Sequence, residues 1–287
     1  PDQVEIRWDK NPLGIDESNG TWKQDWKFEN LKWADIVFTQ NLSNFGGNYT
    51  ARIVGKSKEF GKFVHYDTDD LLTDIYEGHR LYHVYKEKGL EEITKFIYNN
   101  SDLVTVTQRK FAERVQPFIG NGNALAVVKN AVDYNLPCWN QQKLPKPRKK
   151  FCRFGWAGGI HHEEDVKEFF TNMDVALAPL ENNPFNDSKS EIKLAECGRY
   201  KVPLVASNVG CYDEWIVDGE TGFLIDPEKG VSEWTRVLSR VAKDPKLVQR
   251  MGENLHELTE EHFDMNKVVG QRLDLYRQLM GTINVQG

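Results

Sequence analysis

The chain has 287 residues, and its 37 Lys and Arg against 43 Asp and Glu give a net charge of −6. Its 39% hydrophobic and 28% charged residues are typical of a folded globular protein, and the length suits two domains. The mild negative charge argues against a protein that grips a nucleic-acid backbone. No apolar run approaches the roughly 20 residues of a membrane span.

The start of the chain (PDQVEIRWDKNP) shows no secretory signal, so we expect a cytoplasmic protein. The four cysteines are widely spaced and form no C-x-x-C pair, which predicts free thiols.

Short apolar runs alternate with helical patterns along the whole chain. Predicted strands cover 35–40, 62–66, 102–107, 125–129, 151–156, 174–179, 202–207 and 222–226. Predicted helices cover 81–99, 109–118, 188–200, 232–242 and 266–280. Continuously apolar strands are typical of parallel sheets covered on both faces. The alternation therefore predicts an α/β fold with two Rossmann-like, doubly wound halves.

A proline-rich, basic segment at 137–150 (PCWNQQKLPKPRKK) predicts a linker between the halves. We expect one domain over residues 1–143 and a second over 144–265, followed by a C-terminal segment, 266–287. Ligands of open α/β sheets bind at the carboxyl ends of the strands, so the loops there are the candidates for a site.

Two features of the first half could be functional. Asp67, Asp69 and Asp70 follow a predicted strand in the segment YDTDD, where they could hold a divalent cation or cap a following helix. Gly46 and Gly47 could bring backbone close to a ligand.

His79 and His83 are spaced to share a helix face, as in zinc sites. Because that segment offers no third ligand, we expect ordinary helix residues.

The strongest signal is the segment 186–207 (NDSKSEIKLAECGRYKVPLVAS). Ser188 and Glu191 form a capping-box pattern that predicts a helix start. Lys189 and Lys193 would then lie on one face of the first turn, where a helix favours anions. The plain alternative is a capped surface helix with ordinary lysines.

Two glycine-containing loops flank this segment. Gly158 and Gly159, followed by His161, come after one predicted strand, and Asn208, Val209 and Gly210 come after another. Glycines let backbone N–H groups approach a diphosphate closely.

Together these residues resemble the donor-binding segment of retaining glycosyltransferases of family four. The matching positions are Pro179, Leu180, Asn186, Lys189, Ser190, Lys193, Glu196, Pro203, Ala206 and Ser207. The resemblance implies a GT-B fold, in which two Rossmann-like domains face a cleft and the last helix crosses back to the first domain. It implies transfer of a hexose from a nucleoside diphosphate sugar to a hydroxyl, with retention and without metal or other cofactor.

The resemblance also assigns roles. Glu196 matches the second Glu of the family's Glu-x7-Glu signature and would hold the ribose hydroxyls, whereas the first Glu position falls on Ser188, a departure. Lys189, Lys193 and Asp69 are the catalytic candidates. The donor-binding candidates are Gly158, Gly159, His161, Ser188, Glu196, Asn208, Val209 and Gly210, and the acceptor-side candidates are Gly46, Gly47, Asp67 and Asp70.

The acceptor would be a saccharide, a lipid-linked sugar or a small molecule. Alternatives are a GT-B epimerase or phosphorylase, and a non-catalytic binding relic, which the Ser188 departure favours. The stretch 161–174 is shorter than the βα units that the family places there, so we expect either a compact variant or residues left out near 165–167.

Overall fold

The computed structural model describes residues 4–14, 28–41, 47–139, 151–156 and 166–283. The chain forms two compact units: Pro1–Val106 with Ala112–Val127, and Thr107–Phe111 with Val128–Gly287. Most of the predicted linker lies outside the described residues. The sequence runs continuously through 165–174.

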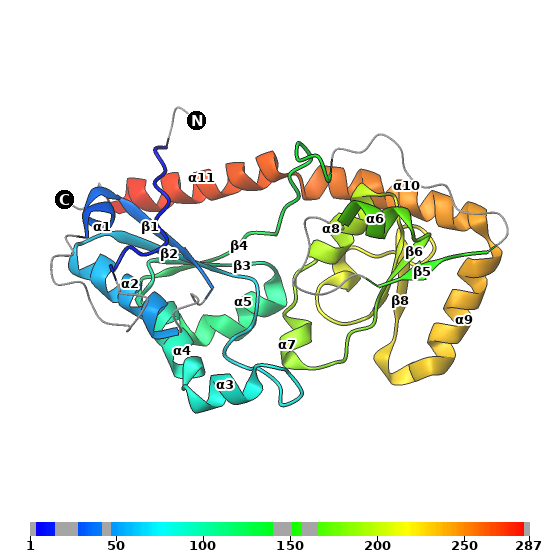
Figure 1. Ribbon diagram of the computed structural model, residues 1–287, viewed down its shortest axis with the longest axis horizontal. Coiled ribbons are helices and arrows are strands. Elements are labelled where there is room, and N and C mark those ends of the chain that lie inside the picture. Colours follow the sequence, from blue (N-terminus) through cyan, green and yellow to red (C-terminus); the bar gives the residue numbers. More distant parts are fainter. Residues whose placement is uncertain (1–3, 15–27, 42–46, 140–150, 157–165, 284–287) are drawn as a thin grey trace. The chain divides into compact units, whose positions relative to one another are not determined.

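The first unit contains a parallel four-stranded sheet in the order β1-β2-β3-β4 (Figure 1). Its strands are β1 (Ile36–Gln40), β2 (Phe63–Thr68), β3 (Leu103–Val106) and β4 (Ala124–Val127). Each overlaps a predicted strand, which confirms the parallel-sheet prediction for this half. β2 and β3 are buried along their whole length because helices cover the sheet.

The helices of this region include two that the sequence pattern did not predict, α1 and α2. The helical elements are α1 (Glu29–Trp33), α2 (Gly47–Glu59), α3 (Tyr82–Glu87), α4 (Leu90–Asn100), α5 (Arg109–Val115) and the 3-10 helix η1 (Gln116–Phe118). The single helix predicted over 81–99 is two helices, because Gly89 adopts φ 60°, a left-handed conformation that ends α3.

The second unit contains another parallel sheet, in the order β5-β6-β7-β8. Its strands are β5 (Phe154–Gly155), β6 (Val175–Ala178), β7 (Leu204–Ser207) and β8 (Gly222–Ile225). The helical elements are α6 (Val166–Thr171), α7 (Pro184–Asp187), α8 (Ile192–Arg199), η2 (Tyr212–Glu214), η3 (Pro227–Lys229), α9 (Gly230–Lys243), α10 (Pro245–His262) and α11 (Met265–Ile283). The two sheets confirm the predicted α/β class.

Close packing on α10 holds the C-terminal end of α8. A Cβ on Gly198 of α8 would lie 2.2 Å from Thr259 Oγ1 of α10. A Cβ on Gly252 of α10 would lie 2.0 Å from the Lys201 carbonyl oxygen. Because a Cβ at either position would clash, both glycines let the C-terminal end of α8 pack closely on α10. Whether α11 packs on the first unit stays a prediction.

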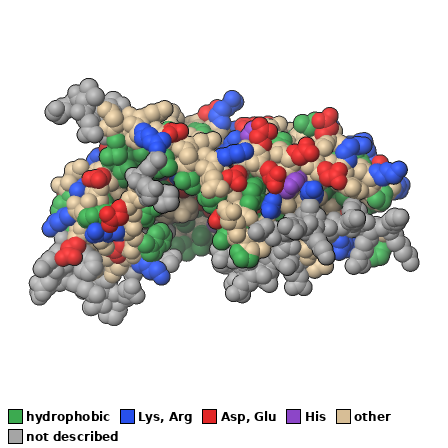
Figure 2. Space-filling view, turned by 90° about the horizontal axis from the view of Figure 1, so that it is seen from above, with side chains coloured by type: hydrophobic (Ala, Val, Ile, Leu, Met, Phe, Trp, Pro, Cys, Tyr) green, Lys and Arg blue, Asp and Glu red, His purple; other side chains and the backbone are tan. Residues whose placement is uncertain are grey.

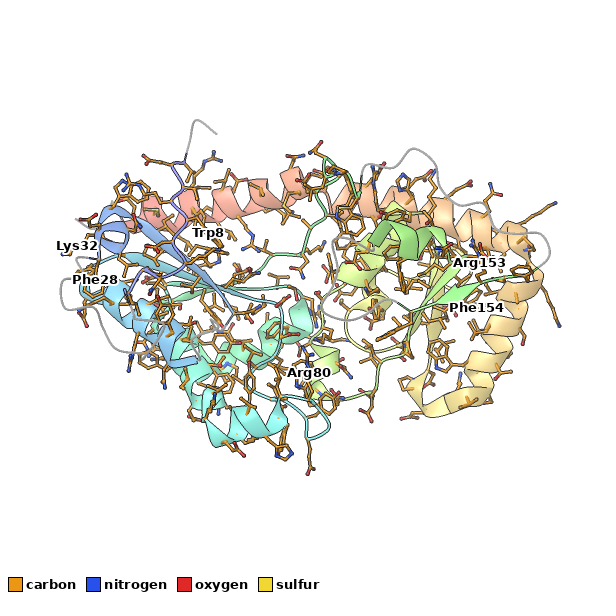
Figure 3. All side chains as sticks on the ribbon, in the orientation of Figure 1. Trp8, Phe28, Lys32, Arg80, Arg153 and Phe154 are labelled. Atoms are coloured by element: carbon orange, nitrogen blue, oxygen red, sulfur yellow. The ribbon has the colours of Figure 1, made fainter. Side chains whose placement is uncertain are left out.

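Charges of both signs are mixed on the face shown in Figure 2, in keeping with the nearly balanced composition. One ion pair is structural: Arg153, just before β5 (Figure 3), contacts Asp174 at 2.8 Å and ties the short β5 to β6. None of the described helices has an apolar stretch as long as a bilayer crossing requires.

Candidate active site

The carboxyl edge of the second sheet brings together the loops that the sequence singled out. Pro179 follows β6, Asn208 follows β7 and Asp226 follows β8. Parallel strands end at the same edge, where α/β proteins bind their ligands. The connection before α8 reaches the same edge, since Gly210 packs on Asn186.

The predicted capping box is wrong. Asn183 caps the short helix α7 by accepting a hydrogen bond from the Asn186 N–H at 2.9 Å. Ser188 is fully buried and donates to the Pro184 carbonyl at 2.9 Å, so its hydroxyl completes α7 rather than opening a new helix. α8 begins at Ile192, three residues later than the pattern predicts for the first helical position.

The two predicted cations do not share a helix face. Lys189 lies in the connection between α7 and α8, with its Nζ 4.4 Å from the centre of the Phe185 ring. Lys193 lies in the first turn of α8 and contacts Glu196 Oε2 at 2.9 Å, with both side chains largely buried. The charge of Lys193 is therefore already balanced by the predicted ribose-binding carboxylate.

The loop Asn208–Gly210 packs tightly on that connection. Gly210 has φ 75°, and a Cβ there would lie 3.3 Å from the Asn186 carbonyl oxygen. Its N–H donates to Asp187 Oδ1 at 3.2 Å. The N–H groups of Asn208 and Val209 bond the Ile225 and Ser207 carbonyls. This loop therefore supports the site through its shape, with its amides already bonded within the protein.

Lys110 is a site residue that the sequence did not reveal. It belongs to the segment Thr107–Phe111 of the second unit, and its Nζ donates to the Gly210 carbonyl at 2.5 Å. The same Nζ lies 3.6 Å from Asp187 and 3.5 Å from Asp213. Nothing in the pattern of the predicted helix 109–118 distinguishes this lysine from a surface residue.

Glu191 is a second residue whose burial and contacts the sequence did not reveal. Only 1% of it is exposed, and its Oε1 has no hydrogen-bond partner. Its Oε2 accepts from Cys211 Sγ at 3.4 Å. Burial raises the pKa of this carboxyl to about 7.

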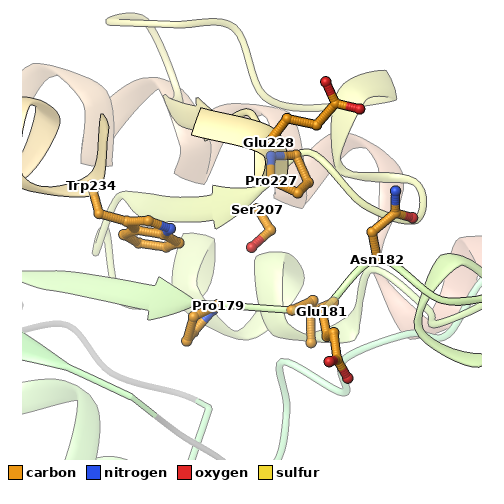
Figure 4. Close-up of a pocket in the computed structure, with 8 residues that line it drawn as sticks. Pro179, Glu181, Asn182, Ser207, Pro227, Glu228 and Trp234 are labelled. Atoms are coloured by element: carbon orange, nitrogen blue, oxygen red, sulfur yellow. The ribbon is translucent and has the colours of Figure 1, made fainter. Parts of the chain in front are cut away.

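A pocket of about 470 Å³ opens at the ends of β6, β7 and β8. Figure 4 shows the Trp234 ring on one side and Asn182 on the other, with Ser207 between them. The lining residues are Pro179, Leu180, Glu181, Asn182, Ser207, Pro227, Glu228 and Trp234. An aromatic wall with hydroxyl, amide and carboxylate groups suits a polyhydroxylated or ring-containing ligand better than a bare phosphate.

The aspartates of the first unit form a separate polar cluster at the end of β2. Asp67 is buried and accepts hydrogen bonds from Thr105 and, at 3.3 Å, from Gln40. Asp69 accepts from Asn41 Nδ2 at 2.9 Å. The helix-cap alternative is wrong, because no described helix begins before Tyr82 in this stretch.

Most of the remaining candidates lie outside the described residues. Gly47 begins α2, whereas Gly46, Gly158, Gly159 and His161 lie outside the described residues. His79 precedes α3 and does not share a helix face with His83. Among the described residues, no group of three or more His, Cys, Asp or Glu could hold a metal ion.

Comparison with known proteins identifies the second unit. Residues 153–257 match the family model described as "Glycosyl transferases group 1". The second unit is therefore similar to group 1 glycosyltransferases over this range. Glu196, Lys193 and the loop Asn208–Gly210 all lie inside the matched range, which supports the family resemblance found in the sequence.

Curated relatives are similar to part of this chain. Alpha-D-kanosaminyltransferase of Streptomyces kanamyceticus is 30% identical over 112 residues, which are 39% of this chain and 28% of the relative. N-acetyl-alpha-D-glucosaminyl L-malate synthase of Bacillus anthracis is 26% identical over 208 residues, 68% of this chain and 48% of the relative. The matches thus span between about a quarter and a half of these relatives' lengths.

Solved structures extend the similarity to both units. Sucrose-phosphate synthase of Thermosynechococcus elongatus has a TM-score of 0.66 at 14% identity, covering 89% of this chain and 75% of that one. Alr3699/HepE of Anabaena, solved with UDP and glucose, has a TM-score of 0.63 at 12% identity, covering 86% and 78%. At these identities the similarity shows the fold, and the fold is that of GT-B glycosyltransferases.

Proposed function

We propose that this chain is a retaining glycosyltransferase that transfers a hexose from a nucleoside diphosphate sugar to an acceptor hydroxyl, without a metal ion or other cofactor. The observation that carries the proposal is the group 1 match over 153–257, which includes the buried Lys193–Glu196 pair of α8. A neighbour in fold, HepE, was solved with UDP-glucose, which supports a donor of this class.

The chemistry of the second unit fits such a donor. When the glycosidic bond breaks, negative charge grows on the leaving diphosphate, so groups aimed at it stabilise the transition state. The first N–H groups of α8 have no partner within the helix, and Lys189 lies three residues before it. Glu196 can accept hydrogen bonds from ribose hydroxyls. The pocket beside Trp234 offers further acceptors for hydroxyl groups.

For the acceptor we propose the aspartates at the end of β2 in the first unit. Asp69, held by Asn41, and Asp67, held by Thr105, can orient a hydroxyl for attack on the donor. A saccharide, a lipid-linked sugar or a small molecule would each present such a hydroxyl. We also propose a cytoplasmic location, because all four cysteines are free thiols.

A thermal-shift screen with UDP-glucose, GDP-mannose and other nucleotide sugars tests the donor assignment. A ligand at 100 times its Kd stabilises the folded state by about 2.7 kcal/mol. The donor that binds is then incubated with saccharide acceptors, and the anomeric configuration of the product is read by NMR. An inverted product would contradict retention, and the absence of any stabilising nucleotide sugar would contradict the donor class.

One observation favours a second candidate, a non-catalytic binding module. Ser188 stands where the family carries its first Glu, and it is fully buried with its hydroxyl bonded to Pro184. A binding module would be stabilised by a nucleotide sugar but would neither transfer nor hydrolyse it. An epimerase would instead release an epimer of the donor without any acceptor. Product analysis with and without acceptor separates the three.

A further inference from the structure

Glu191 and Cys211 connect two segments of the candidate site at the edge of the second sheet. Glu191 ends the connection that carries Lys189, and Cys211 directly follows the loop Asn208–Gly210. Cys211 Sγ lies 3.4 Å from Glu191 Oε2 and 3.6 Å from the Lys189 carbonyl oxygen, and it can donate to either. Both residues are 1% exposed, so water does not compete freely for these contacts.

Counting protons shows that the two contacts depend on the charge of Glu191. A thiol has one hydrogen and is also a weak acceptor. When Glu191 is neutral, its own proton can point to Sγ, which leaves the thiol hydrogen for the Lys189 carbonyl. When Glu191 is ionised, the thiol hydrogen is drawn to the carboxylate, because charged acceptors bind a donor more strongly than neutral ones. The Lys189 carbonyl then loses this donor.

Ionisation of Glu191 also costs free energy because the charge is buried. Glu191 Oε1 is buried without a hydrogen-bond partner. A buried charge that lacks partners is strongly unfavourable, so ionisation favours a conformation in which this oxygen reaches water.

The surroundings of Glu191 do not compensate for that cost. Burial is the largest influence and raises its pKa to about 7. Hydrogen bonds from its own backbone N–H and from the Cys211 thiol lower the pKa, as does Lys129, and Glu214 of η2 raises it, but burial outweighs the lowering influences. Lys129 is itself held over the Trp215 ring, at 4.3 Å from its centre. The neighbouring Tyr212 and Cys211 stay neutral because burial raises the pKa of each. On α8 itself, Lys193 is engaged by Glu196.

We propose that Glu191 is a positioning residue of the donor site that works in its neutral form: while it is neutral, the Cys211 thiol holds the Lys189 carbonyl, and its ionisation removes that contact because the thiol hydrogen then goes to the carboxylate. This inference rests on the proposed function for the identity of the ligand. The contact itself is a property of the ligand-free protein, so the two can be tested separately.

Variants at positions 191 and 211 test this arrangement of hydrogen bonds. Glu191→Gln is neutral at every pH and can still donate to Sγ, so it keeps the contact. Cys211→Ser keeps one donor and one acceptor atom, whereas Cys211→Ala removes both. Glu214→Gln is the matched control: it keeps Glu191 titratable and should only shift the transition to lower pH.

The first experiment needs no ligand. Amide hydrogen exchange over residues 188–191 and 208–211 is compared between the wild type and Glu191→Gln at pH 6 and pH 8. Comparison at the same pH cancels the intrinsic pH dependence of exchange. We expect equal rates at pH 6 and, at pH 8, exchange in the wild type faster by about threefold or more, since the released segments open locally. Equal rates at pH 8 overturn the proposal.

The second experiment uses UDP-glucose, whose diphosphate has no free terminal phosphate to titrate near pH 6. If only the neutral form binds fully, its Kd rises about tenfold from pH 6 to pH 8 in the wild type. The pH dependence should vanish in Glu191→Gln, persist in Cys211→Ser, and give weak binding at both pH values in Cys211→Ala.

The outcomes separate the two proposals. An identical pH dependence of the Kd in wild type and Glu191→Gln overturns the positioning role. No binding of UDP-glucose to the wild type at pH 6 contradicts that donor while the exchange experiment still decides the role of Glu191.

Discussion

Lys193 Nζ lies 2.9 Å from Glu196 Oε2, and the two side chains are 16% and 9% exposed. A cation expected to face a diphosphate is thus paired with the carboxylate expected to face the ribose. Ligand binding must adjust this pair, because each group has a second partner in the proposed complex. The two functions cannot be changed independently.

We therefore predict that Glu196→Gln weakens nucleotide binding and also lowers stability. The amide keeps an acceptor for Lys193 but removes the charge, so unfolding should cost about 1 kcal/mol less. The ribose contact loses its charge assistance, so the Kd for the nucleoside diphosphate should rise about tenfold. Urea denaturation and calorimetric titration measure the two effects. Glu260→Gln, which disturbs the exposed contact of Arg199, is the control. An unchanged Kd would remove Glu196 from the site.

The stability of the protein should fall between pH 4.5 and pH 7 because of Glu191. The pKa of its carboxyl is about 7 in the folded chain against 4.5 as the ordinary value. Between these values the folded state holds one more proton than the unfolded state, so the free energy of unfolding decreases as pH rises and levels off above pH 7. The full effect is up to about 3 kcal/mol.

Denaturation curves at half-unit pH steps measure this effect as the difference between the wild type and Glu191→Gln. The variant should gain relative stability as pH rises. A difference that is constant with pH would show that Glu191 titrates normally.

The strands and the position of the candidate site were predictable from sequence because they depend on local patterns. Buried parallel strands read as continuous apolar runs, and each of the eight expected runs overlaps a strand. The start of α8 was not predictable. Ser188 and Glu191 fit a capping box, but Asn183 and Pro184 open an extra helix upstream, and Ser188 closes it.

Lys110 and Glu191 were missed for a different reason. Their roles come from contacts with Gly210 and Cys211, 100 and 20 residues away in the chain. No spacing rule connects such positions, since only the folded sheet edge brings them together. The prediction of a single helix over 81–99 is wrong for a third reason. The apolar pattern continues across Gly89, but the left-handed backbone of this glycine separates α3 from α4.

In the first unit, the Thr105 hydroxyl should contribute strongly to stability, because it links side chains of β2 to β3. Thr105 donates to Asp67, so its oxygen must accept from His65 Nε2, which lies 2.7 Å away. Thr105→Val leaves two buried polar groups without this partner, and we expect a loss of about 2–4 kcal/mol in the free energy of unfolding. Thr105→Ser should restore most of it.

Nitrogen chemical shifts of the His65 ring check the same arrangement by NMR. They should show the proton on Nε2. A proton on Nδ1, or a Thr105→Val variant as stable as the wild type, would contradict the chain of hydrogen bonds.

Lys189→Ala should lower kcat more than it raises the KM for the donor. The diphosphate carries more charge in the transition state than in the intact donor, so a cation aimed at it stabilises the transition state preferentially. Removing one such contact should reduce kcat about 10²–10³-fold in a site that excludes water. Steady-state kinetics with saturating acceptor separate the two constants.

The control and the companion variants decide what the loss means. Lys243→Ala, at the exposed end of α9, removes a cation far from the sheet edge and should leave both constants unchanged. Lys189→Arg should restore little activity, because a planar guanidinium differs from an ammonium in reach and geometry. Lys193→Ala also leaves Glu196 without its partner, so its effect combines diphosphate and ribose contacts and should include a higher KM.

A rise in KM alone for Lys189→Ala would show that this lysine holds the ground state only. Full activity in the Lys189→Ala, Lys193→Ala double variant would mean that the diphosphate is bound elsewhere, and residues 158–161 would become the leading candidates.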